Sequence, residues 1–445
     1  MKQSRKSNGT LETLLVIGLI LIIPLFFVMR TTAEQNAAPP LPTAANVPAQ
    51  PTAANTEEDN AMKSKQPPAC TFPLAEIKAE ESTPEEYSFS EPEVVLSHPD
   101  NLYNIVEWLP DNQRVLMVEE IRDGSSVIIQ QSIELYNPQT GERQVYAMRN
   151  QTIEPPSWQS ELNAVVYPDT NVLEIDKVNN HYNFTRQVWV SQGNPDSTKL
   201  IADNLPQYFV AVKPDGSETI YLSDKKISKQ DKSLKDTQSV PFDPAQWDYA
   251  KERGKELPVS YQMTWQPHTS LLFFYSDGDT GGGYTFILDS KTGQVCELSL
   301  GGWAARAQWS PNGRYLAIAR YQGKRPTDSS DLAILDVVTG NLYTMRVTPQ
   351  EMEGKHYVSD ITWAPDNRHV LAMGSVFPFQ STGQTDHRGL YLVDFMSGQS
   401  DQILSSYRFS GSNLVWSPDG SKLLVRCPTI EEDRVCFIAV QRSGQ

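Results

Sequence analysis

The chain repeats one short pattern at nearly regular intervals. A tryptophan is followed two residues later by proline, then by aspartate or asparagine, and then by asparagine or glycine. Complete copies begin at Trp108, Trp309, Trp363 and Trp416, and weaker copies begin at Trp158, Val212 and Trp265. The copies lie about 50 residues apart, a typical length for one repeated structural unit. The sequence therefore predicts seven similar units.

Each unit is expected to hold four antiparallel strands. A short strand ends at the tryptophan, proline presets φ for a turn, and aspartate or asparagine with glycine completes it. A run of β-forming residues follows, as at Arg314 to Ala319, and then a hairpin around a glycine such as Gly340. Four-stranded units repeated around an axis predict an all-β fold, a β-propeller of about seven blades, with six as the alternative.

The repeated tryptophans are expected to fill the space between adjacent blades rather than to bind a ligand. This structural role is predicted for Trp108, Trp158, Trp265, Trp309, Trp363 and Trp416. The last unit ends in its third strand, Val435 to Val440, so we expect Val94 to Leu96 to supply the fourth strand and close the ring. The third unit is irregular, because Ser223 to Ser260 is polar and lysine-rich, and Asp243 and Pro244 indicate a helix that begins there and ends at Leu257.

The N-terminal residues, 1–30, predict a cytoplasmic tip and a membrane anchor. Leu14 to Met29 is almost wholly apolar, close to the roughly 20 residues that cross a bilayer as a helix. Lys2, Arg5 and Lys6 precede it, which places the N-terminus in the cytoplasm and the remainder outside a bacterial-type cytoplasmic membrane, in a single-pass topology. The alternative is a signal peptide cleaved after Ala33, which would release a secreted protein.

Residues 31–93 predict a disordered stalk followed by an acidic spacer, because a Pro- and Ala-rich composition cannot bury a core. The propeller is expected over residues 94–445. The chain has 54 acidic and 38 basic side chains, a formal net charge of -16. Nucleic acid is excluded as an expected partner, because its phosphates are bound by positive charge.

The run Trp416 to Gly420 and the other copies resemble the Pro-Asp propeller repeats of TolB-like proteins and of the prolyl oligopeptidase propeller domain. The resemblance covers about residues 94–441 and implies the fold, but it implies no activity, because its residues form turns and packing contacts. TolB has six blades and an N-terminal α/β domain, for which the interval before the ring is too short. The peptidases' Gly-x-Ser-x-Gly motif is absent.

The sequence predicts no metal site, cofactor or catalytic residue, because its six histidines show no pair at ligand spacing and Cys-x-x-Cys is absent. Export favours disulfide bonds, and Cys427 and Cys436 flank a hairpin loop where neighbouring strands could bring them together. Cys70 with Cys296 would follow by elimination. Four cysteines allow three connectivities, and free buried thiols are the alternative.

The two faces of the predicted ring differ. The first and third turns of each unit emerge on one face and are stereotyped, whereas the second turn and the crossover emerge on the other. The second face carries longer, variable loops, at 168–185, 321–331, 348–360 and 374–389, where binding residues are usually found. Candidate partner-binding residues there are Trp303, Arg306, Asp360, Phe377, Phe379, Tyr407 and Phe409.

An aromatic patch that contains arginine is typical of a protein-interaction surface. We therefore expect a membrane-anchored, extracytoplasmic propeller that binds or scaffolds a protein or cell-envelope ligand. The aromatic residues could instead fold back onto neighbouring blades. The alternative function is that of a propeller hydrolase or lyase, acting on a glycan or peptide at the channel mouth.

Overall fold

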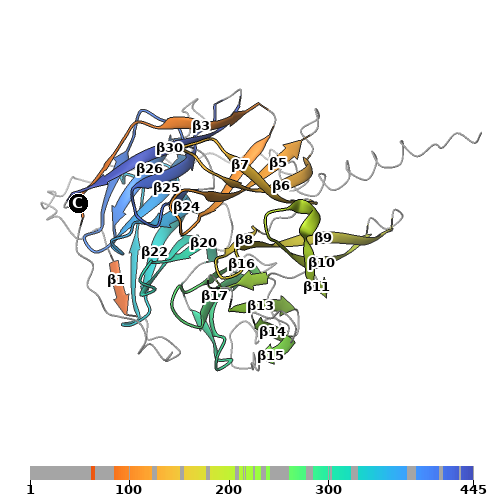
Figure 1. The fold of residues 1–445 in the computed structure, drawn as a ribbon. Helices are drawn as coiled ribbons and strands as arrows, with labels where there is room; N and C mark the ends of the chain where they lie inside the picture. Colours follow the sequence, from red (N-terminus) through yellow and green to blue (C-terminus); the bar gives the residue numbers. More distant parts are fainter. Residues whose placement is uncertain are drawn as a thin grey trace, which may run out of the picture.

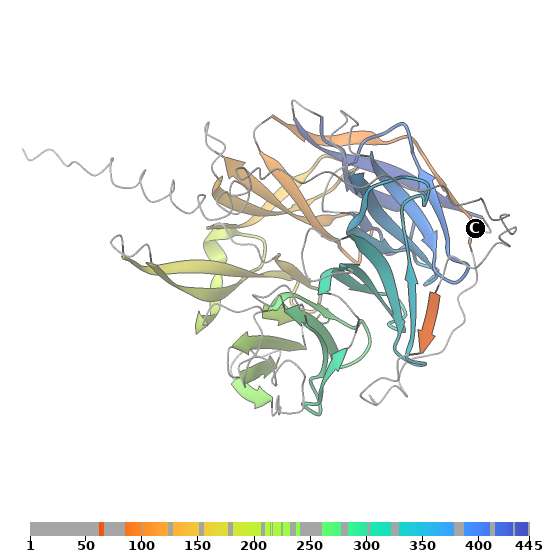
Figure 2. The same cartoon turned by 180° about the vertical axis from the view of Figure 1, so that it is seen from behind.

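A computed structural model describes residues 62–65, 85–99, 101–122, 128–150, 155–176, 181–205, 210–213, 215, 217–223, 226–231, 237–240, 260–276, 284–298, 300, 303–321, 329–377, 387–409, 414–429 and 432–443. Within these ranges the chain is almost wholly β-structure, with a short 3-10 helix at Pro195–Ser197. Seven antiparallel sheets follow one another around a ring in chain order (Figure 1; from behind, Figure 2). The all-β, seven-bladed propeller is thereby confirmed, and the six-bladed alternative is wrong.

Each blade is a meander in which the strands pair in chain order. Blade 1 consists of β4 (Leu102–Trp108), β5 (Val115–Arg122), β6 (Ile128–Tyr136) and β7 (Arg143–Arg149). Blade 2 consists of β8 (Ser157–Gln159), β9 (Ala164–Asp176), β10 (His181–Ser191) and β11 (Lys199–Leu205). Blade 3 consists of β12 (Val210–Val212), β13 (Glu218–Ser223), β14 (Lys226–Asp231) and β15 (Thr237–Val240).

Blade 4 consists of β16 (Ser260–Trp265), β17 (Leu271–Ser276), β18 (Tyr284–Asp289) and β19 (Val295–Leu298). Blade 5 consists of β20 (Trp303–Trp309), β21 (Tyr315–Tyr321), β22 (Ser330–Asp336) and β23 (Asn341–Met345). Blade 6 consists of β24 (Lys355–Trp363), β25 (His369–Phe377), β26 (His387–Asp394) and β27 (Gln399–Ile403). Blade 7 consists of β28 (Val415–Trp416), β29 (Lys422–Arg426) and β30 (Asp433–Arg442), together with strands from the N-terminal part of the chain.

The repeated tryptophans pack between blades. All six are between 4% and 8% exposed. The indole Nε1 of Trp363 donates to the carbonyl of Gln308 in blade 5 over 2.9 Å, and that of Trp309 donates to the carbonyl of Thr264 in blade 4 over 3.0 Å. In both cases the acceptor lies one residue before the tryptophan of the preceding blade. The motif therefore supplies a hydrogen bond between blades as well as apolar packing.

The Pro-Asp turns also connect neighbouring blades. Asn112 and Asn367 hold the left-handed position of their turns, with φ of 56° and 57°, a conformation that asparagine tolerates better than most residues. Asn367 Oδ1 accepts the backbone N–H of Asn312 over 2.7 Å, and Asn112 Oδ1 accepts that of Asp419 over 3.0 Å. These side chains join the turns of blades 5 and 6 and of blades 7 and 1.

The ring closes through the N-terminal part of the chain. Strand β3 (Glu93–His98) pairs antiparallel with β30, with Val94 opposite Cys436 and Leu96 opposite Val435. The predicted closing strand is confirmed, and it is longer than expected. A further strand, β2 (Tyr87–Phe89), pairs with the end of β30 beyond it (Figure 1).

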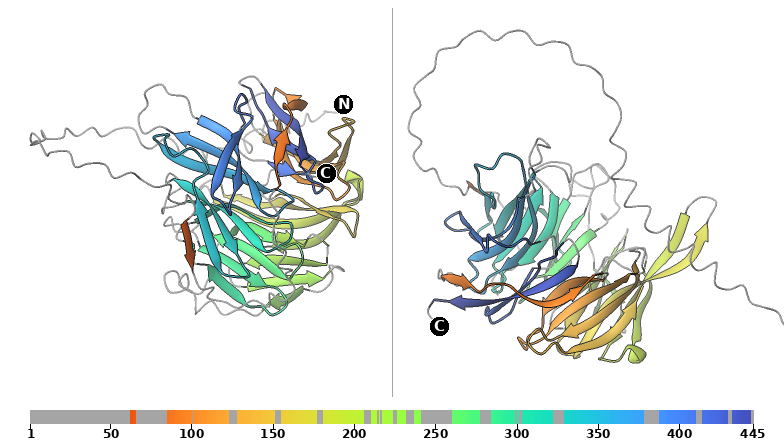
Figure 3. Two further views of the ribbon diagram at one scale, coloured as in Figure 1. Left: turned by 90° about the vertical axis from the view of Figure 1, so that its left-hand side faces the viewer. Right: turned by 90° about the horizontal axis from the view of Figure 1, so that it is seen from above.

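A third N-terminal strand, β1 (Met62–Lys65), lies outside blade 5. It pairs antiparallel with β23, from Met62 opposite Thr344 to Lys65 opposite Asn341 (Figure 3, left). Both β1 and β2 fall in the range that the sequence predicts as stalk and spacer. In blade 3, the polar stretch after Ser223 contains the strands β14 and β15.

Cys427 and Cys436 form a disulfide bond within blade 7. Cys296, on β19, is also disulfide-bonded, and its predicted partner Cys70 lies outside the described residues. The predicted helix from Asp243 to Leu257 and the predicted membrane span from Leu14 to Met29 lie outside them too. In the part of the chain that the structure describes, no helix combines the length and the apolar character needed to cross a membrane.

Candidate functional site

The two faces of the ring differ in the connections that they carry. The turn face carries the Pro-Asp turns and the glycine hairpins, such as Asp336 to Gly340 in blade 5. The loop face carries the connections between the second and third strands and the crossovers between blades. At blades 5 and 6 it is formed by the end of β21, the start of β22, residues 346–354 and the start of β24.

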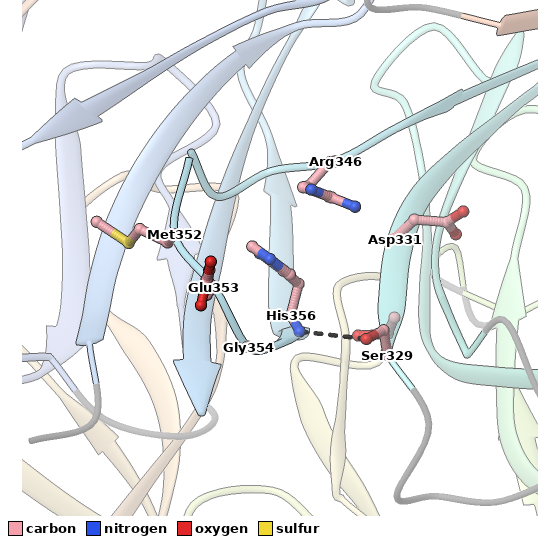
Figure 4. Close-up of a pocket in the computed structure, with 8 residues that line it drawn as sticks. Ser329, Asp331, Arg346, Met352, Glu353, Gly354 and His356 are labelled. Carbon is pink, nitrogen blue, oxygen red and sulfur yellow. Dashed lines mark hydrogen bonds between the residues drawn. The ribbon is translucent and has the colours of Figure 1, made fainter. Parts of the chain in front are cut away.

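A pocket of about 360 Å³ opens on the loop face, between blade 5 and the crossover into blade 6 (Figure 4). It is lined by Ser329, Ser330, Asp331, Arg346, Met352, Glu353, Gly354 and His356. Most of the lining comes from two of the variable loops in which the sequence predicts binding residues, 321–331 and 348–360, and Arg346 lies just before the second of them.

His356 lies at the centre of the pocket, and its residue surface is 6% exposed. Its Nδ1 shares a hydrogen bond with the hydroxyl of Thr348, and its backbone N–H donates to Ser329 Oγ over 3.3 Å. Burial, followed by the positive charge of Arg346, lowers the pKa of His356 below its ordinary value of 6.5. The imidazole is therefore neutral at pH 7.

The charged residues of the pocket differ in their pairing. Asp331 accepts two hydrogen bonds from Arg320, over 2.9 Å from Nε and 2.6 Å from Nη2, so its charge is compensated. Arg346 and Glu353 are both exposed, and neither forms an ion pair with any residue that the structure describes. Among the residues that the structure describes, the pocket thus presents one cation and one anion that have no ion-pair partner.

Gly354 shapes the wall of the pocket. Its φ is 155°, and a Cβ atom at this position would lie 2.5 Å from the carbonyl oxygen of Phe377. Only glycine lets the crossover come this close to the end of β25.

An aromatic row lies beside the pocket and consists of Tyr321, Tyr357 and Phe377. The rings of Tyr321 and Tyr357 are 6.4 Å apart, and those of Tyr357 and Phe377 are 5.1 Å apart, both edge to face. The guanidinium of Arg388 lies 6.0 Å from the centre of the Phe377 ring. All three aromatic residues are half-buried and stand at the loop-face ends of their strands. Three blade strands therefore place one aromatic surface on this face.

No protein-family model and no curated protein matches this chain. Solved propeller structures do match it. An oligogalacturonate lyase from Vibrio parahaemolyticus aligns with a TM-score of 0.53 and 9% identity, over 81% of this chain and 98% of its own. An oligogalacturonate lyase in complex with manganese aligns with a TM-score of 0.50 and 10% identity, over 81% and 98%. These similarities show the fold alone.

TolB from Acinetobacter baumannii aligns at 13% identity over 78% of this chain and 80% of its own, with a TM-score of 0.38, too low to support a conclusion. Within the described ranges, no three His, Cys, Asp or Glu side chains gather as a metal site would require.

Two of the predicted site residues, Arg306 and Asp360, are brought together. Arg306 Nε donates to Asp360 Oδ1 over 3.0 Å, and Asp360 Oδ2 accepts the backbone N–H of Leu414 over 2.9 Å. The Asp360 side chain is 2% exposed, whereas that of Arg306 is 40% exposed. Asp360 therefore links blades 5, 6 and 7, and Arg306 remains accessible from solvent.

The other predicted site residues do not join the Arg306–Asp360 pair. Phe377 joins the aromatic row. Phe409 is 1% exposed and packs with Trp416 in the core between blades 6 and 7. Tyr407 is half-buried against the same core, and a hydrogen bond with Glu91 raises its pKa. The alternative in which aromatic residues fold back onto neighbouring blades describes Phe409 and Tyr407. Phe379 and the side chain of Trp303 lie outside the described part of the chain.

Arg346, His356, Tyr321 and Tyr357 are not among the site residues that the sequence predicts. The loops 321–331 and 348–360, which contain the last three, are predicted from their length and variability, and these say nothing about the direction of each side chain. Arg346 lies outside both loops. One usable signal existed: Tyr321 ends a second strand and Tyr357 begins a first strand, so both fall on the loop face of adjacent blades.

Proposed function

We propose that the protein is a binding ring whose loop face at blades 5 and 6 engages a protein partner outside a bacterial-type cytoplasmic membrane. The observation that carries this proposal is the aromatic row with Arg388 at its end. Tyrosine, phenylalanine and arginine are enriched at the centres of protein interfaces.

The aromatic row suits binding because its rings are both accessible and held in place. Each half-buried ring still exposes apolar surface, and covering that surface stabilises a complex by about 25 cal/mol per Å². Edge-to-face contacts fix Tyr357 between its two neighbours, so a partner would order few additional rotatable bonds. The hairpins of the turn face, in contrast, satisfy their own polar groups, as Asp336 does by accepting from Val338 and Thr339.

Two features of the chain support the proposal that the ring lies outside the membrane. A disulfide bond between Cys427 and Cys436 is typical of an oxidising compartment. Leu14 to Met29 would anchor the protein, and residues 31–61, which precede β1 on blade 5, would tether the ring to the membrane.

Alanine substitution tests the proposal in intact cells. Partners are crosslinked, purified with the protein and quantified for Tyr357→Ala, Phe377→Ala and a control, Met396→Ala. Met396 is 39% exposed and lies in the hairpin between β26 and β27, on the turn face of the same blade. The proposal expects the partner to fall about tenfold or more in the first two variants and to be retained in the control. Equal recovery from all three variants would contradict it.

A second candidate is the hydrolase or lyase that acts on a glycan or peptide. The neutral imidazole of His356 beside the unpaired Arg346 favours it, because a base next to a cation suits proton abstraction from a substrate with developing negative charge. Turnover of a glycan or peptide library that disappears in His356→Asn would support this candidate. Turnover that is absent in the unmodified protein, or unchanged in the variant, would exclude it.

A further inference from the structure

The pocket on the loop face presents two charges of opposite sign that have no ion-pair partner in the described part of the chain. Arg346 directly follows β23 and Glu353 lies near the end of the same crossover, before β24, and Figure 4 shows the two side chains apart in the lining of the pocket. They do not form an ion pair with each other. Two opposite charges that face one cavity without meeting leave room for a ligand that carries both.

The remaining titratable groups of the pocket are already neutral or compensated. Asp331 is paired with Arg320, and His356 is neutral at pH 7. A ligand with only a negative charge would pair with Arg346 but leave the carboxylate of Glu353 facing it. A ligand with only a positive charge would pair with Glu353 but leave the guanidinium of Arg346 facing it. A zwitterion pairs with both Arg346 and Glu353 and adds no net charge.

We propose that this pocket binds a free α-amino acid or a zwitterion of similar size, with its carboxylate on Arg346 and its ammonium group on Glu353. Neither the aromatic row nor a protein partner is needed for this binding.

The uncharged lining fits such a ligand. Ser330 Oγ accepts the backbone N–H of Val358 over 2.6 Å, and Ser329 Oγ accepts that of His356. Among the described residues neither hydroxyl has an acceptor of its own, so each can donate to a ligand carboxylate. Met352 supplies an apolar wall against which a small side chain could pack. The volume of about 360 Å³ lies at the small end of ligand sites, which suits a single amino acid.

Calorimetry on the full chain tests the charge pattern with L-alanine and L-methionine as probes. Acetate and methylammonium supply each charge alone. The expected result is that the amino acids bind about tenfold or more tightly than either half, because two charge-assisted hydrogen-bonded contacts form instead of one. Acetate or methylammonium binding as tightly as L-alanine would overturn the proposal, as would the absence of binding by either amino acid.

Two variants locate the binding. Arg346→Gln and Glu353→Gln should each weaken L-alanine binding about tenfold or more. Arg114→Gln, at a half-buried arginine in the Pro-Asp turn of blade 1, should leave it unchanged. Arg346 and Glu353 are exposed and unpaired, so both variants should fold, which near-ultraviolet circular dichroism checks. The imidazole NMR signals of His356 should shift when L-alanine is added. Unchanged affinity in both pocket variants, or binding without movement of the His356 signals, would overturn the proposal.

Discussion

Arg306 donates through Nε to Oδ1 of Asp360 over 3.0 Å, and this ion pair joins blade 5 to blade 6. The two residues occupy the same place in the repeat, three positions before Trp309 and Trp363. The second carboxylate oxygen accepts the backbone N–H of Leu414, so one buried side chain holds three consecutive blades.

Replacing Asp360 should therefore destabilise the ring. Asp360→Ala leaves the Arg306 guanidinium and the N–H of Leu414 without their partner, and the free energy of unfolding should fall by about 3 kcal/mol. Urea unfolding followed by tryptophan fluorescence measures the change. The control is Arg434→Ala, which breaks the more exposed pair with Glu432 and should cost less than about 1 kcal/mol. Equal losses in the two variants would show that Asp360 does not act as an inter-blade link.

Ring closure can be tested by shortening the N-terminus. A chain that begins at Glu85 keeps β2 and β3, whereas a chain that begins at Asn101 loses both and exposes the edge of β30. The shorter chain should be less stable by at least about 3 kcal/mol, because Val95 and Leu96 pack against the core of blades 7 and 1. Thermal unfolding of the two chains measures the difference, and identical midpoints would rule out closure by these strands.

Gly354 should tolerate alanine poorly. Gly354→Ala places a Cβ atom 2.5 Å from the carbonyl oxygen of Phe377 at a positive φ, and should cost about 2–3 kcal/mol. Gly141→Ala is the matched control, because Gly141 also has a positive φ but nothing lies within 4 Å of its Cβ position. The control should cost about 1 kcal/mol in the same urea titration. A control loss as large as that of Gly354→Ala would mean that backbone strain alone, and not the contact with β25, requires glycine.

Glu107 should make stability depend on pH. Burial between blades 1 and 2 raises the pKa of the Glu107 carboxyl to about 7. A hydrogen bond from the backbone N–H of Trp158 lowers the pKa, but by less than burial raises it. Between its ordinary pKa of 4.5 and pH 7, the folded protein retains a proton that the unfolded chain releases, so stability falls as pH rises through this window.

Glu107→Gln removes this titration and keeps a side-chain oxygen for the N–H of Trp158. From pH 5 to pH 8 the unmodified protein should lose about 2–3 kcal/mol more stability than the variant. Urea titrations of both proteins at the two pH values give the comparison. The same pH dependence in both would show that Glu107 titrates normally in the folded state.

The fold could be predicted because each repeat carries residue types that favour its own turn and its own packing contacts. Asn112 and Asn367 stand where the turn needs a positive φ, and each tryptophan stands where a blade needs packing. The missing strand of the last unit could be inferred for the same reason. Strand β1 could not, because a polar segment such as Met62 to Lys65 has no strand pattern of its own, and pairing with β23 alone defines it. Strand β14, Lys226–Asp231, is also polar and gave no clear pattern.

The site was only partly predictable. Arg306 and Asp360 were predicted as residues of the loop face, but their ion pair with each other was not predicted. The pocket was not predictable, because the crossover that holds Glu353 follows a path set by the close approach of Gly354 to Phe377. No local sequence pattern encodes that approach.

The central claim is that the loop face at blades 5 and 6 binds a partner, and site-specific photocrosslinking in living cells tests it most directly. A photoreactive phenylalanine analogue replaces Tyr357 in one strain and Met396, on the turn face of blade 6, in another. The predicted result is one discrete crosslinked partner from position 357 and none from position 396. The absence of a crosslinked product at position 357, or the same product from both positions, would contradict the claim.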